Sequence, residues 1–168
     1  HGDALGRHRL MDKGPFMYDD TYRVPLVAAG PGLRQGVCDE FVYLHDVFDT
    51  VLELAGIADG PGSDGTSLMP LLTGDGTWES REEVFGEFDE QLVRFPQRMV
   101  RTRTHKLVYN PGADSELYDL NLDPHEMVNR IRDPAYAEVK DDLAGRLAAH
   151  LRDSKDREAA KFAFFMEP

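Results

Sequence analysis

The first thirteen residues gather side chains that could bind a metal ion or an anion. The sequence opens HGDALGRHRLMDK, which places His1, His8 and Lys13 among glycines. A neutral imidazole can ligate a metal ion, and an ammonium group can offset the charge of an oxyanion. No helical or strand periodicity runs through the stretch, so we expect a polar loop. Loops of this composition are also common without any ligand, and residue types alone favour that plainer interpretation.

The segments that follow are typical of an α/β protein. The apolar run at residues 24–29 ends at a Gly-Pro-Gly turn and predicts a buried strand. Apolar residues at helical spacing predict a helix that Asp46 caps and Gly56 ends, and a shorter helix over residues 67–74. Because ligands of open α/β sheets bind at the carboxyl ends of strands, the loop with His1, His8 and Lys13 is well placed for polar chemistry in such a fold. Because a parallel strand needs neighbours, we expect the partners of residues 24–29 to lie upstream of this sequence.

The second half of the sequence changes pattern at about residue 83. Short aromatic and β-branched runs, EEVFGEF, QRMVRTRT, HKLVYN and SELYDL, predict three or four antiparallel strands with a turn at residues 110–112. Asp123, Pro124 and Glu126 together form a helix-start signal. A last helix is predicted over residues 134–153, with one face packed on the core. The apolar tail KFAFFME is expected to pack as well.

Composition excludes several classes of function. Lys and Arg number 19 against 31 Asp and Glu, for a formal charge of -12, which argues against nucleic acid as a partner. No apolar run is long enough to span a bilayer, so we expect a soluble protein, with its compartment left open. Cys38 is the only cysteine and cannot form an internal disulfide.

These patterns predict a mixed α/β fragment with two parts. Residues 1–80 are expected to be the end of a larger α/β domain, and residues 81–168 a small antiparallel sheet with a packed C-terminal helix. A chain that opens directly on a dense polar loop is also expected to continue a longer one.

Five segments of the chain, in order, resemble the sulfatase family. In the first segment, residues 1–32, HGDALGRHRLMDK resembles the family's D-H-G-x-x-L-G-x-H-x-L-x-x-K without its first Asp, and the run from Arg23 to Gly32 resembles its R-V-P-L-I and P-G. The others are YLHDVFDTVLELAGI, DGTSLMPLLTG, KLVYN and ELYDLNLDPHEMVN. The resemblance implies the alkaline-phosphatase-like α/β fold, with a smaller C-terminal domain around a four-stranded antiparallel sheet.

The resemblance also implies a reaction and roles for three residues. Sulfatases hydrolyse sulfate esters with a formylglycine nucleophile and bind a divalent cation, usually Ca²⁺. By position, His1 matches a cation ligand and Lys13 matches the lysine that contacts the sulfate oxygens. His8 matches a position near the substrate mouth, although a packed or solvated loop side chain is an equal interpretation.

Other parts of the family's active site are absent from this sequence. Cys38 lies in GVCDEF, without the Pro and Arg of the formylglycine motif C/S-x-P-x-R. Ca²⁺ takes six to eight ligands, mostly oxygen, and a single imidazole will not hold it. We therefore expect the isolated chain to be inactive and to need the N-terminal part of the same protein as its partner.

Two alternatives to a sulfatase remain open at this point. Phosphonate and phosphate ester hydrolases of the same superfamily share much of the opening motif. A non-catalytic interaction module, with the acidic surface and apolar tail serving a protein partner, is the second. Within the sulfatase interpretation, the substrate is a small-molecule or saccharide sulfate ester whose identity the sequence leaves open.

Overall fold

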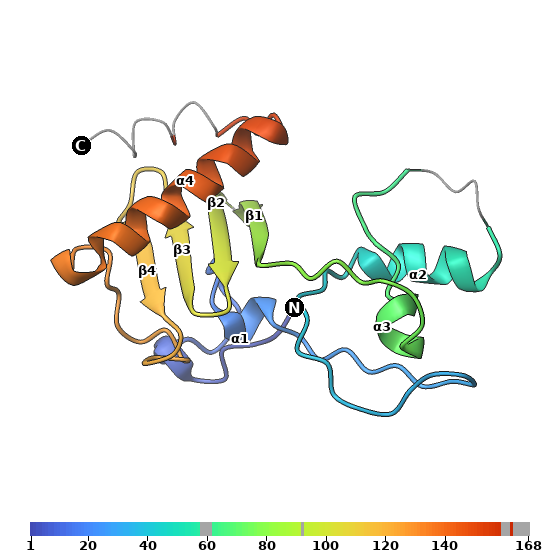
Figure 1. The fold of residues 1–168 in the computed structure, drawn as a ribbon. Coiled ribbons are helices and arrows are strands. Elements are labelled where there is room, and N and C mark those ends of the chain that lie inside the picture. The colour runs from blue at the N-terminus through green and yellow to red at the C-terminus, as the bar shows by residue number, and fades with distance from the viewer. Residues whose placement is uncertain (58–61, 92, 159–161, 163–168) are drawn as a thin grey trace. The chain divides into compact units, whose positions relative to one another are not determined.

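The computed structural model describes residues 1–57, 62–91, 93–158 and 162 of the 168-residue chain (Figure 1). Its contacts divide the chain into two compact units. Unit 1 comprises His1–Val24 together with Glu83–Pro168, and unit 2 comprises Pro25–Glu82. The expected boundary between residues 80 and 81 stays a prediction about a larger protein, because here residues 1–24 group with the C-terminal sheet.

Unit 1 is built on one antiparallel sheet (Figure 1). Its strands follow the order β1-β2-β3-β4 and are β1 (Glu83–Gln91), β2 (Val93–Thr102), β3 (His105–Tyr109) and β4 (Glu116–Asp119). Each strand pairs with the next along the chain. The expected turn after β3 includes Gly112, whose φ of 81° suits glycine. The predicted four-stranded sheet is confirmed.

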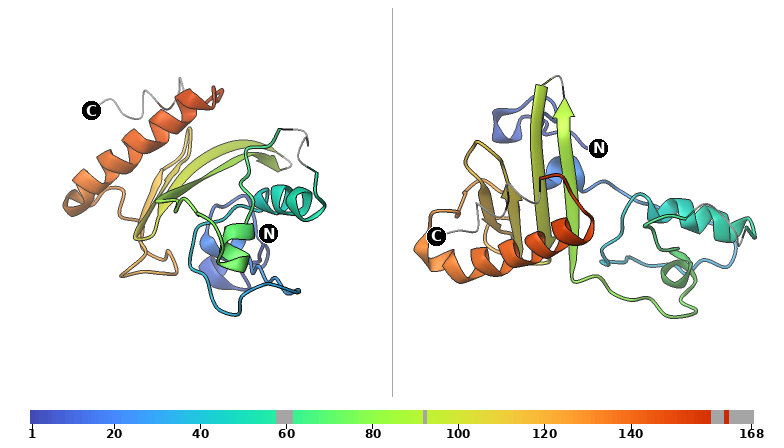
Figure 2. Two further views of the ribbon diagram at one scale, coloured as in Figure 1. Left: turned by 45° about the vertical axis from the view of Figure 1, so that its right-hand side comes forward. Right: turned by 90° about the horizontal axis from the view of Figure 1, so that it is seen from above.

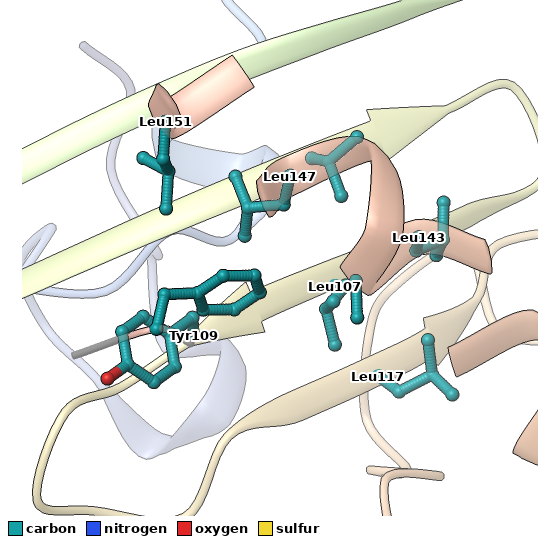
Figure 3. Packing of buried hydrophobic residues seen from close by; sticks show 9 residues of the cluster. Leu107, Tyr109, Leu117, Leu143, Leu147 and Leu151 are labelled. Carbon is teal, nitrogen blue, oxygen red and sulfur yellow. The ribbon is translucent and has the colours of Figure 1, made fainter. Parts of the chain in front are cut away.

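Helix α4 (Ala137–Asp153) covers one face of this sheet and is preceded by the short helix η2 (Pro134–Tyr136) (Figures 1 and 2). The side chains that meet between α4 and the sheet are buried and almost entirely aliphatic (Figure 3). From α4 they are Leu143, Leu147 and Leu151, and from the sheet Val100, Leu107, Tyr109 and Leu117. Phe162 is the one described residue of the predicted tail, and its ring packs edge-on against Tyr109.

Residues 1–24 cover the opposite face of the sheet (Figure 2). They contain two short helices, η1 (Arg7–Arg9) and α1 (Asp19–Tyr22). Met17 packs there against Met99 and Val108, which alternate along their strands with residues of the α4 face. The segment closes on itself at Gly2, whose N–H donates to Thr21 O at 2.8 Å. A Cβ at Gly2 would lie 1.9 Å from Asp20 O, so only glycine fits.

Unit 2 contains α2 (Asp46–Leu54) and α3 (Met69–Thr73), in agreement with the two predicted helices. Gly56 adopts a φ of 70° just after α2, as expected for a glycine that ends a helix. Asp46 does not cap α2 as predicted, because it is the first helical residue and its carboxylate is used elsewhere. It accepts from Tyr43 N and Thr66 N and pairs with Arg81 at 2.6 Å.

The Arg81 guanidinium also lies over the ring of Trp78, 5.1 Å from its centroid. Burial of Asp46 acts to raise its pKa, but the hydrogen bonds from Arg81 and the two backbone N–H groups outweigh it and lower the pKa below its usual value. Asp46 therefore ties three segments of unit 2 together as a charged group.

Two predicted elements are absent. Residues 24–29 form no strand and are exposed, because the described chain offers no neighbouring strand for them to pair with. Residues 123–126 form turns and no helix. The φ of Glu126 is 57°, which an α-helix cannot accommodate, and its carboxylate is buried against the sheet.

Among the described residues, no helix combines the length and apolarity that crossing a membrane requires.

Candidate functional site

The three residues singled out in the sequence lie on the loop that precedes α1. The His1 side chain is exposed, and its Nδ1 lies 2.8 Å from the carbonyl oxygen of Gly2. Because a carbonyl can only accept, the ring donates from Nδ1 in this contact, which leaves Nε2 as the nitrogen that a neutral His1 would offer to a metal ion. Lys13 is half-buried. In the part of the chain that the structure describes, no hydrogen bond or ion pair joins His1, His8 and Lys13.

His8 is held by an aromatic contact. Its ring stacks on that of Tyr18, with centroids 3.7 Å apart and planes 3° from parallel. Its Nε2 is buried and has no hydrogen-bond partner among the described residues. Its backbone adopts a φ of 52°, which is uncommon for a residue with a side chain. The stacked ring therefore sits in one fixed orientation inside the loop.

A group of four charged side chains, two of them buried and two half-buried, joins this loop to the sheet. We call it the sheet-face cluster, and its members are Asp19, Arg101, Lys106 and Glu126. Lys106 Nζ donates to Met17 O at 2.9 Å and lies 2.6 Å from Asp19 Oδ1 and 2.5 Å from Glu126 Oε1. The Lys106 side chain is fully buried, and a buried charge requires a partner of opposite charge. Asp19 and Glu126 provide these partners.

The remaining contacts of the sheet-face cluster reach the backbone and Arg101. Asp19 N donates to Glu126 Oε2 at 2.6 Å, and Arg101 Nη2 lies 2.9 Å from Asp19 Oδ2. Burial favours a raised pKa for both acids. For Asp19 the cations Lys106 and Arg101 outweigh burial and lower the pKa, whereas for Glu126 burial outweighs the attraction of Lys106 and the pKa is raised.

Arg7 adds a further link between the loop and its surroundings. Its Nε lies 3.0 Å from Asp20 Oδ2, at the start of α1, and its guanidinium contacts the ring of His125. The loop is thus fixed to the turn after β4 as well as to the sheet.

Sequence reasoning missed the sheet-face cluster. In the sequence, Lys106 lies inside the motif KLVYN, and Glu126 belongs to a pattern that predicts a helix start. The available signal was a lysine inside a short apolar strand, at a position that shares its face with Val108. A lysine at such a position must be paired if it is buried.

The described residues do not make a calcium site by themselves. They contain no group of three or more His, Cys, Asp or Glu side chains arranged to hold a metal ion. His1 can offer one nitrogen, whereas Ca²⁺ requires six to eight ligands that are mostly oxygen. A calcium ion would need most of its ligands from outside the described residues.

Comparison with known proteins shows that the sequence and the fold of this chain are similar to those of sulfatases. The family model described as N-sulphoglucosamine sulphohydrolase, C-terminal, matches residues 6–153. A Delta 4,5-hexuronate-2-O-sulfatase of Bacteroides thetaiotaomicron is 34% identical over an alignment of 163 positions that covers 93% of this chain and 34% of that protein. The chain therefore spans about a third of the length of this relative.

Two solved structures show the same fold. The structure of a 2-O GAG sulfatase superposes with a TM-score of 0.83 at 32% identity, covering 95% of this chain and 36% of that one. A phosphonate monoester hydrolase from Silicibacter pomeroyi superposes with a TM-score of 0.78 at 27% identity, covering 94% and 34%. Lys13 and His8 lie within the range that the family model matches, and His1 lies outside it.

Proposed function

Because the chain belongs to the family of N-sulphoglucosamine sulphohydrolase C-terminal domains, we propose that it forms the C-terminal part of an enzyme that hydrolyses sulfate esters. The observation that carries the proposal is the match of one sulfatase family model to residues 6–153, which include the loop with Lys13. The agreement of the fold with a 2-O GAG sulfatase over 95% of the chain supports it.

We propose a saccharide sulfate ester as the substrate. The name of the relative from B. thetaiotaomicron specifies a 2-O-sulfated hexuronate. A further structural neighbour, with a TM-score of 0.57 and 27% identity over 68% of this chain, was solved with D-glucosamine-2-N,6-O-disulfate. The formylglycine nucleophile would lie outside this chain, because the sequence lacks its motif.

In this proposal Lys13 acts on the charge of the reacting sulfate group. Its ammonium would offset negative charge on the nonbridging oxygens and on the departing oxygen, where charge develops in the transition state. His8 would border the substrate entrance. His1 would supply one ligand, through Nε2, to a calcium ion whose other ligands come from the rest of the protein.

The exposed apolar side chains of unit 2 support the proposal that another part of the protein covers this unit. It exposes several large apolar side chains, and extensive exposed apolar surface often marks a site that another protein segment covers. They include Leu26, Val27, Val37, Leu44, Phe48, Val51, Leu54 and Ile57. We propose that the N-terminal part of the same protein covers them.

The proposal is tested by assaying the full-length protein with an aryl sulfate and an aryl phosphonate monoester side by side, and then with a 2-O-sulfated disaccharide. We expect faster turnover of the sulfate esters, and no turnover by residues 1–168 alone. The phosphonate monoester hydrolase that superposes on this chain makes that activity the second candidate. Turnover of the phosphonate alone would favour phosphonate monoester hydrolysis as the activity. Turnover of neither ester would contradict both candidate activities.

A further inference from the structure

The sheet holds the backbone on both sides of one aromatic residue, Tyr18. On one side, Met17 O accepts a hydrogen bond from Lys106 Nζ at 2.9 Å. On the other side, Asp19 N donates to Glu126 Oε2 at 2.6 Å. These two contacts come from β3 and from the turn after β4, so they fix the position of Tyr18 relative to the sheet.

The Tyr18 ring connects this fixed backbone to the loop through its contact with His8. One of its faces lies flat against His8, at 3.7 Å between centroids. The ring also meets Tyr118 edge-on, at 6.2 Å and 61°, and the Tyr118 hydroxyl donates to Glu116 Oε2 at 2.8 Å. A shift of Tyr18 would therefore shift the stacked ring of His8, whose buried Nε2 has no hydrogen-bond partner among the described residues to hold it.

The groups that hold Tyr18 are costly to maintain. Glu126 is buried and keeps a left-handed φ of 57°, a conformation that is unfavourable for residues with a Cβ and persists only where the surroundings enforce it. A buried ion pair is often replaceable by apolar residues without loss of stability, so stability alone does not require Lys106 and Glu126. What they supply that apolar residues cannot is a directed contact to the backbone at Met17 and Asp19.

We propose that Lys106 and Glu126 are positioning residues for the active-site loop. They set the place of Tyr18 and, through its ring, the orientation of His8 on the loop that also carries Lys13. This inference rests on the proposed sulfatase function, and it assigns to the C-terminal sheet a part in positioning the loop that carries His8 and Lys13.

The test uses variants of the full-length protein. Lys106→Met keeps an unbranched side chain that is one atom shorter and removes its three contacts. Glu126→Gln keeps an oxygen that can accept from Asp19 N and removes the charge. The matched control is Asp156→Asn, which alters a buried carboxylate that pairs with Arg98 at 2.7 Å on the opposite face of the sheet.

We expect Lys106→Met to lower kcat/KM by roughly 10–100-fold, the scale for losing a group that orients an active-site residue, with most of the loss in kcat. Glu126→Gln should lose less, and Asp156→Asn should stay close to the wild type. Tyr18→Phe should retain activity because the ring remains, whereas Tyr18→Leu should lose as much as Lys106→Met.

Hydrogen–deuterium exchange of residues 10–24 separates this inference from the proposed function. Exchange there should quicken in Lys106→Met and remain unchanged in Asp156→Asn, whether or not the protein turns over sulfate esters. If Lys106→Met does not fold, the same comparison is made between Tyr18→Leu and Tyr18→Phe. Unchanged exchange and kcat in Lys106→Met, or an equal loss in Asp156→Asn, would overturn the inference.

Discussion

Lys13 and Lys106 place an ammonium group in two different environments within unit 1. Lys106 is fully buried and neutralised by Asp19 and Glu126. Lys13 is half-buried, and among the described residues no ion pair neutralises it. An ammonium without a carboxylate partner remains available to an incoming anion, whereas a paired one serves the protein's own structure.

The role proposed for Lys13 leads to a residue-level prediction. In the full-length protein, Lys13→Ala should lower kcat for a sulfate ester by roughly 10²–10³, the scale for losing one electrostatic contact in the transition state. Lys140→Ala, on the surface of α4, is the control and should leave kcat unchanged. A Lys13→Ala enzyme with the kcat of the wild type would exclude the role.

At the residue level, the sequence predicted the candidate residues of the loop but not the sheet-face cluster that holds the loop in place. His1, His8 and Lys13 lie within thirteen positions, so their spacing could be compared with a motif. Asp19 and Glu126 are 107 positions apart, and no local pattern relates them. Their pairing follows only from the fold, which brings the turn after β4 against α1. The roles of the three loop residues themselves stay predictions.

At the level of elements, local periodicity predicted those that form with partners inside the chain. The four strands and α4 have alternating or helical apolar patterns, and each packs on another described element. Residues 24–29 have the composition of a strand but no strand beside them. Residues 123–126 have a helix-start pattern, and the buried contacts of Glu126 override it. Long-range contacts decided both outcomes.

The packing of α4 on the sheet gives an element-level prediction. Leu147 is 1% exposed between α4 and the sheet, so Leu147→Ala should lower the free energy of unfolding by about 2–5 kcal/mol through lost burial and a cavity. Leu122→Ala, at a side chain 74% exposed, should change it by less than about 0.5 kcal/mol. Urea denaturation followed by circular dichroism measures both, and similar losses would contradict the packing described for α4.

At the level of the whole molecule, a different kind of interaction stabilises the interior of each of the two units. Unit 1 has a layered core on both faces of its sheet. Unit 2 has few buried apolar side chains and depends on Asp46, which is fully buried and bound to Arg81 and two backbone N–H groups. The order of family motifs predicted the fold, but the grouping of residues 1–24 with the sheet required the long-range contacts themselves.

The dependence of unit 2 on Asp46 gives a pH prediction. The folded pKa of Asp46 is lowered below its unfolded value of about 3.9, so its stabilising contribution is present above that pH and is lost as pH falls through the folded value. Trp78, the sole tryptophan, lies beside Arg81 and reports on unit 2. The difference in urea midpoint between wild type and Asp46→Asn, followed by tryptophan fluorescence, should shrink as pH falls below about 4. A difference that is constant with pH would contradict the assignment.

The alternation of charged and apolar positions along β3 also constrains how the sheet can assemble. Lys106 faces residues 1–24, and its neighbour Leu107 faces α4. A slip of β3 by a single residue would push the ammonium among the leucines and turn Leu107 toward the carboxylates, a mismatch that an all-apolar strand would not suffer. A buried lysine at this position would therefore disfavour misaligned pairings of β3, an effect that does not depend on any reaction of the finished protein.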